Sequence, residues 1–134
     1  MFLNLLHAES RQLFLETAYT LAHADGVFAE AEKEMLKAYC REMDTAFDFE
    51  HAPIAMQDLK EKMAANMSPT EKKIVIFELI GLALADGEYG AEERAVMQTL
   101  IHDFGLPGIY GDQCEALLKK YFELPKALAS LVLG

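Results

Sequence analysis

The chain has 134 residues, 52% of them hydrophobic and 25% charged, which is the balance of an ordinary soluble globular domain. Its net charge of −10 argues against a nucleic-acid partner, whose phosphates need a basic surface, and against docking on anionic lipid. Its two cysteines lack Cys-x-x-Cys spacing, the first residues show no secretory signal, and no apolar run is long enough to span a bilayer. We therefore expect a single cytoplasmic domain over residues 1–134, with no stable membrane insertion.

Apolar residues recur at intervals of three and four along most of the chain, which is the period of an amphipathic helix. Gly26, Gly87 and the Gly105-Leu106-Pro107-Gly108 sequence mark helix ends, and Ser68-Pro69-Thr70-Glu71 is a helix start with Ser as its cap. No segment alternates with the period of two that a strand shows. The sequence therefore predicts an all-α fold, a compact bundle of about seven helices. After a helical turn near residues 2–6, helices are expected over residues 9–24, 30–43, 54–66, 69–85, 91–104, 112–122 and 125–133.

One segment of the chain occurs twice, with a constant offset of 61 residues. Both copies, residues 21–32 and 82–93, read Leu-Ala-x-Ala-Asp-Gly, then one variable residue, an aromatic residue and, four positions later, Glu. Apolar positions also match on both sides, so the repeat extends over about residues 14–43 and 75–104. We expect two pseudo-symmetric helical hairpins packed on each other, each with a tight acidic turn.

Each turn carries two acidic residues that suit a divalent cation, Asp25 and Glu32 in the first copy and Asp86 and Glu93 in the second. Their spacing reproduces the second half of an EF-hand calcium loop, in which a Gly, an apolar residue and a bidentate Glu follow one another. The first half is absent, and one turn alone offers too few oxygens for calcium, which takes about six to eight. If the two turns face each other, the four carboxylates form one shared site. The candidate ions are Ca, Mg, Mn and Zn.

A purely structural role explains the same residues. Glu32 lies three residues after Ala29, and Glu93 three residues after Gly90, the expected N-caps, where a Glu can accept a hydrogen bond from the cap residue's own N–H. Neither cap residue has a side-chain oxygen, which weakens the reciprocal capping box and leaves each Glu somewhat freer. Further acidic residues crowd both turns, and packed carboxylates are unfavourable unless a positive charge is near. On sequence alone, both interpretations stay open.

The doubled pattern Ala24-Asp25-Gly26-x-Phe28-(three)-Glu32 and Ala85-Asp86-Gly87-x-Tyr89-(three)-Glu93, after an apolar helix, resembles the TerB-like family of tellurite-resistance proteins. It is also similar to the region attached to the J-domain in some membrane-associated co-chaperones. The resemblance covers about residues 9–106. It implies a compact bundle of about seven helices, a role in stress (tellurite) response, and a metal site at the four acidic residues of the turns. Because tellurite is an oxyanion, the acidic turns are not expected to bind it directly.

No catalytic constellation stands out in the sequence. The four histidines lack zinc-site spacing, the serines lack a nucleophile-elbow pattern, and there is no Gly-rich phosphate loop, so we expect no enzyme and identify no small-molecule substrate. The leading hypothesis is a non-enzymatic TerB-like domain that binds a divalent cation at its Asp-Gly turns. The second is a protein–protein interaction module for an unknown partner, with purely structural acidic caps. The third is a hydrolase that uses paired carboxylates and a metal.

Overall fold

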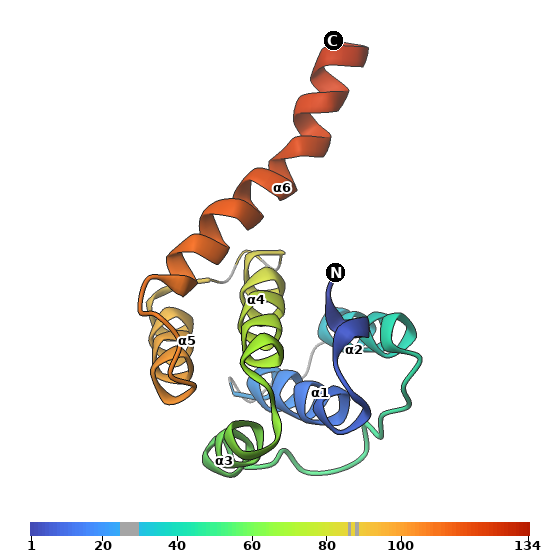
Figure 1. The fold of residues 1–134 in the computed structure, drawn as a ribbon. Helices are drawn as coiled ribbons and strands as arrows, with labels where there is room; N and C mark the ends of the chain where they lie inside the picture. Colours follow the sequence, from blue (N-terminus) through green and yellow to red (C-terminus); the bar gives the residue numbers. More distant parts are fainter. Residues whose placement is uncertain (25–29, 86, 88) are drawn as a thin grey trace. The chain divides into compact units, whose positions relative to one another are not determined.

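The computed structural model describes residues 1–24, 30–85, 87 and 89–134, and all regular structure in these ranges is helical (Figure 1). The all-α prediction is therefore confirmed for the described residues. Within these ranges there are six α-helices and one short 3-10 helix rather than about seven helices. They are η1 (Leu3–Leu5), α1 (Ala8–Ala22), α2 (Glu30–Met43), α3 (Met56–Asn66), α4 (Pro69–Ala85), α5 (Ala91–Asp103) and α6 (Tyr110–Leu133).

The helix count is lower because α6 is continuous through Pro125, where the sequence predicted two separate helices over residues 112–122 and 125–133. A proline removes one backbone donor and opposes the helix locally, which is why a break was expected. One missing hydrogen bond does not end a helix whose flanking residues are strong helix formers. Leu124 before the proline, and Lys126, Ala127 and Leu128 after it, are such residues.

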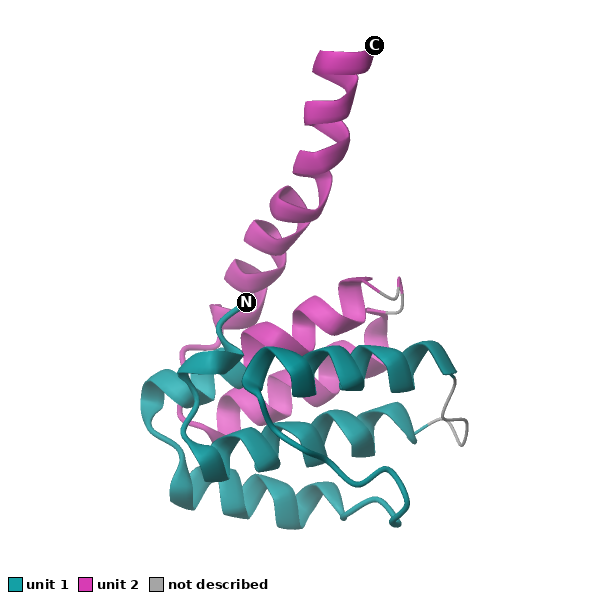
Figure 2. Cartoon of the chain, turned by 90° about the vertical axis from the view of Figure 1, so that its right-hand side faces the viewer, with its two compact units in different colours: residues 1–75 teal, residues 76–134 magenta. Residues whose placement is uncertain are grey.

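The chain forms two compact units, residues 1–75 and residues 76–134, and the boundary between them falls inside α4 (Figure 2). In unit 1, helix α1 packs against both α2 and α3, and η1 packs against α2. The core of unit 1 is made by apolar side chains that these elements share. Its fully buried members include Leu3, Leu6, Phe14, Leu15, Leu36, Met43, Leu59 and Met63.

In unit 2, helix α5 packs against the first half of α6. A Cβ atom at Gly111 would lie 2.9 Å from Ile101 Cδ1, so this glycine permits the close approach of α6 to α5. The core of unit 2 combines α4, α5 and the start of α6. Its buried apolar members are Ile76, Leu79, Ile80, Met97, Leu100, Ile101, Phe104, Cys114 and Leu118.

The helices of the two copies of the repeated segment start at matching positions. Helices α1 and α4 begin at residues 8 and 69, and helices α2 and α5 begin at residues 30 and 91, so both pairs keep the offset of 61. Asp44 and Gly105, also 61 apart, follow α2 and α5 with positive φ angles of 49° and 71°. At each position the backbone hydrogen bonds are those of a Schellman motif, which closes the helix end.

Candidate functional site

Of the four predicted cation ligands, Asp25 and Asp86 lie outside the described residues. Glu32 lies in the first turn of α2, in unit 1, and Glu93 in the first turn of α5, in unit 2. Among the residues that the structure describes, no group of three or more His, Cys, Asp or Glu side chains is placed to hold a metal ion. The shared site of four carboxylates therefore stays a prediction, as do the candidate ions.

The second acidic turn is closed by contacts of its own residues. Gly87 has a φ angle of +73°, which favours glycine, and its N–H donates to the carbonyl of Leu84 at 3.1 Å. The N–H of Gly90 donates to Glu93 Oε2 at 3.1 Å. Because Gly90 has no side chain, only this half of a capping box can form. One carboxylate oxygen of Glu93 thus caps helix α5, as the structural interpretation predicts.

The aromatic residue of this turn is part of a larger cluster that ties α5 to α6. The Arg94 guanidinium lies 4.4 Å from the ring centre of Tyr89, a cation–π distance. The same guanidinium donates to both carboxylate oxygens of Glu115, at 2.5 and 2.6 Å, and Lys119 Nζ lies 2.7 Å from Glu115 Oε2. Arg94 first, and then Lys119, lower the pKa of the buried Glu115 to about 2. The sequence did not predict this cluster, because Glu115 gives no local signal of its partner.

A second buried carboxylate, Glu71, joins the start of α4 to the start of α1. The predicted helix start with Ser68 as its cap is confirmed, and the two residues form a capping box: the N–H of Ser68 donates to Glu71 Oε1 and the N–H of Glu71 donates to Ser68 Oγ, both at 3.1 Å. The other oxygen of Glu71 accepts the N–H of His7 at 2.9 Å and lies 2.6 Å from His7 Nδ1. Burial opposes ionisation, but the hydrogen bonds from His7, Ser68 and Ser10 outweigh it and lower the pKa of Glu71 to about 2.

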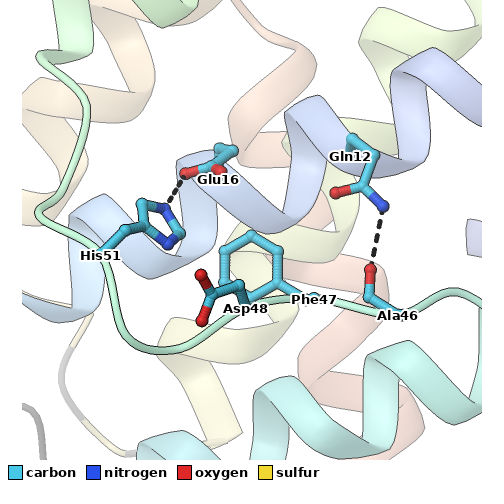
Figure 3. Close-up of a pocket in the computed structure, with 6 residues that line it drawn as sticks. All are labelled: Gln12, Glu16, Ala46, Phe47, Asp48 and His51. Atoms are coloured by element: carbon cyan, nitrogen blue, oxygen red, sulfur yellow. Dashed lines mark hydrogen bonds and ion pairs between the residues drawn. The ribbon is translucent and has the colours of Figure 1, made fainter.

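Unit 1 also has an open pocket of about 540 Å³, between α1 and the segment that follows α2 (Figure 3). His51 Nε2 lies 2.9 Å from Glu16 Oε2, and this hydrogen bond raises the pKa of His51. Gln12 Nε2 donates to the carbonyl of Ala46 at 2.9 Å, and the Tyr19 hydroxyl donates to the carbonyl of His51 at 2.6 Å. Figure 3 shows the Gln12 and Glu16 side chains reaching from α1 toward residues 46–51. These contacts hold that segment on α1.

Helix α6 carries an exposed apolar stripe. Its members are spaced by four, three, four and three residues, and each is between 51% and 82% exposed. We call them the α6 seam: Leu117, Tyr121, Leu124, Leu128 and Leu131. Figure 2 shows the last turns of α6 extending away from the rest of unit 2. The spacing of these apolar residues is visible in the sequence, but periodicity alone does not show which apolar stripe of a helix is covered by other side chains.

Polar residues occupy the opposite side of this part of α6. Lys119, Glu123, Lys126 and Ser130 also follow the helical period and lie about 180° around the helix from the seam. Among the residues that the structure describes, no helix is both long enough and apolar enough to cross a membrane. The segment is thus an amphipathic helix with an exposed apolar side.

No family model, no curated protein and no solved structure matches this chain. The resemblance to the TerB-like family therefore rests on the repeated turn alone and stays a prediction. The site that the described residues support is not a ligand cluster. It consists of two buried carboxylates that hold helices together and an apolar seam on α6.

Proposed function

We propose that this chain is a non-enzymatic protein-binding module that presents the α6 seam to its partner. The observation that carries the proposal is the exposure of the seam: five large apolar or aromatic side chains are each more than half exposed along one side of a helix. An exposed apolar patch rimmed by polar residues is typical of a protein interaction site. On this proposal, the acidic turns are helix caps, and their role is to fix the scaffold from which α6 extends.

The contacts around the second turn support this division of roles. Glu93 caps α5, and Arg94 pairs with Glu115 while covering the ring of Tyr89. Since Glu115 lies in the first part of α6, these contacts fix the direction in which the rest of the helix extends. Anchored in this way, a rigid helix loses little conformational entropy when it binds, which favours affinity.

We further propose that the two hairpins descend from one duplicated unit and are pseudo-symmetric. The matching helix starts and the matching Schellman ends at Asp44 and Gly105 support this proposal. Divalent-cation binding at Asp25, Glu32, Asp86 and Glu93, with the stress-response role that the TerB-like resemblance implies, is the second candidate function. What favours it is the recurrence of an acidic first turn in both α2 and α5.

Capture from the cells that make the protein tests the proposal. The full chain is expressed with an affinity tag beside an untagged copy, and bound proteins are identified by mass spectrometry. A Leu124→Glu variant disrupts the seam, and Ser130→Glu adds the same charge on the opposite stripe as a matched control. We expect a bound protein that the wild type and Ser130→Glu retain and Leu124→Glu loses. If all three chains capture the same proteins, the seam is not the binding surface and the proposal fails.

A further inference from the structure

We propose that the α6 seam binds a second copy of this chain, as an antiparallel, two-fold symmetric helix pair centred near Leu124. This inference rests on the proposed function and names its partner. In such a pair, Leu117 of one copy lies near Leu131 of the other. Both copies use the same surface, as a two-fold interface requires.

The spacing of the seam is that of a helix–helix contact. Apolar residues that alternate intervals of three and four repeat every 3.5 residues, the period that keeps one side of a helix facing a partner helix. The stripe that packs on the core of unit 2 is a different one, with Gly111, Cys114 and Leu118. It lies about 100° around the helix from the seam. Helix α6 therefore has one side for its own core and a second side still exposed.

The exposed area fits an interface of ordinary size. The five seam residues and the neighbouring Val132 are each more than half exposed. Together they offer roughly 600 Å² per copy, so a pair that covers them buries about 1,200 Å², which is the low end of stable protein–protein interfaces. The seam is about 21 Å long from Leu117 to Leu131, so two helices can meet along all of it.

The charge distribution favours an antiparallel arrangement of the two copies. Residues 76–116 carry eight acidic and one basic side chain, a net charge of −7, whereas residues 117–134 carry three lysines and one glutamate, a net charge of +2. An antiparallel pair places the acidic parts of the two copies, residues 76–116, at opposite ends of the helix pair, where they repel each other least. A parallel pair would instead place the two acidic parts side by side, where they repel each other. An anionic bilayer would repel the acidic part of a single chain, which disfavours a membrane as the occupant of the seam.

Sedimentation equilibrium of the full chain tests the inference at about 1–200 µM protein and ~0.15 M NaCl. We expect a reversible dimer with twice the chain mass of 15.0 kDa. Leu124→Glu removes two buried leucines from the symmetric pair and should raise the dissociation constant roughly 100-fold or more. Ser130→Glu should change it less than about threefold, because residue 130 lies on the opposite stripe. Both positions are exposed, so circular dichroism should show unchanged folding.

Cysteine cross-linking tests the orientation in a background with Cys40→Ser and Cys114→Ala. Leu117→Cys and Leu131→Cys chains should form a mixed disulfide with each other on oxidation, and neither should cross-link efficiently to itself. Efficient self-linking of Leu117→Cys would instead show a parallel pair and overturn the antiparallel arrangement.

The outcomes separate this inference from the proposed function. A chain that stays monomeric, but captures another protein or binds phosphatidylcholine–phosphatidylglycerol vesicles only with an intact seam, overturns the second copy as occupant. Capture of a protein would leave the proposed function standing, whereas vesicle binding alone would replace it. If the chain is monomeric and Leu124→Glu changes neither protein capture nor vesicle binding, both the inference and the proposed function are overturned. A dimer that Leu124→Glu leaves unchanged would place the interface elsewhere and also overturn the inference.

Discussion

Helices α2 and α5 begin at matching positions of the repeat, 61 residues apart, but contact different segments of the chain. Lys33 in α2 and Arg94 in α5 occupy equivalent positions, 61 residues apart. Lys33 Nζ lies 5.9 Å from the ring centre of Phe49, in the irregular segment after α2. Arg94 instead pairs with Glu115 on α6, the helix that follows α5. Helix α2 thus contacts an irregular segment and helix α5 contacts another helix, and this difference gives each unit a different surface.

The largest effect expected from this comparison is in the matched core positions Phe14 and Val75, which are both fully buried. Phe14→Ala should lower the free energy of unfolding by about 4 kcal/mol, because it leaves a large cavity. Val75→Ala, which removes fewer atoms, should cost about 2 kcal/mol. Urea unfolding followed by circular dichroism measures both. As a control, Leu131→Ala on the exposed seam should cost less than about 0.5 kcal/mol in monomeric protein. Equal losses at positions 14 and 131 would contradict the assigned core.

Acid should weaken both units, because each has one buried carboxylate with a depressed pKa. Glu71 and Glu115 have folded-state pKa values of about 2, below the ordinary value of 4.5. A depressed pKa stabilises the fold above pH 4.5, and this contribution is lost as pH falls toward 2. We expect each group to contribute about 2–3 kcal/mol at neutral pH.

The variants Glu71→Gln and Glu115→Gln separate the two contributions. Each should lower the free energy of unfolding at pH 7 and flatten its decline between pH 4.5 and 2, as measured by urea unfolding at a series of pH values. Glu9→Gln, on the exposed start of α1, is the control and should leave the decline unchanged. A profile that neither substitution flattens would show that other groups govern acid unfolding.

A smaller effect is expected where the two copies end their second helix. Asp44 and Gly105 both adopt positive φ, a conformation that costs a non-glycine residue about 1 kcal/mol. Asp44→Gly should therefore stabilise the chain by about 0.5 kcal/mol, and Gly105→Asp should destabilise it by about 1 kcal/mol. The melting temperatures of the two single variants, and of the double variant with both substitutions, measure these changes in stability. If both substitutions have the same sign, the two helix ends are not equivalent.

Local signals predicted much of the fold. The starts of α2 and α4, the capping box at Ser68 and Glu71, and the helix end near Gly87 follow from patterns within a few residues. The continuity of α6 did not follow, because a helix through Pro125 depends on its whole flanking sequence. The ion pair between Arg94 and Glu115 could not be predicted either. Helical periodicity shows which side of a helix a residue occupies, but not which residue of another helix it contacts.

The candidate site shows the same limit. The sequence identified Glu93 and offered capping as one of two roles, because the capping distance of three residues is local. The predicted grouping of four carboxylates depends on tertiary structure, which no local pattern fixes: Asp25, Glu32, Asp86 and Glu93. The α6 seam was visible as spacing, yet its exposure depends on which other side chains cover it.

The most direct test of the claim that the acidic turns are caps is the melting temperature with and without divalent cations. We measure the wild type, Glu93→Gln, and Asp25→Asn with Asp86→Asn, in a chelator and in about 5 mM Ca²⁺, Mg²⁺ or Mn²⁺, or a lower concentration of Zn²⁺. We predict no ion-dependent shift, and a loss of about 0.5–1 kcal/mol for Glu93→Gln that is the same in every condition. An ion bound at one hundred times its dissociation constant would stabilise the fold by about 3 kcal/mol. Such a rise in the wild type, abolished by the double substitution, would contradict the capping account and establish the turns as a cation site.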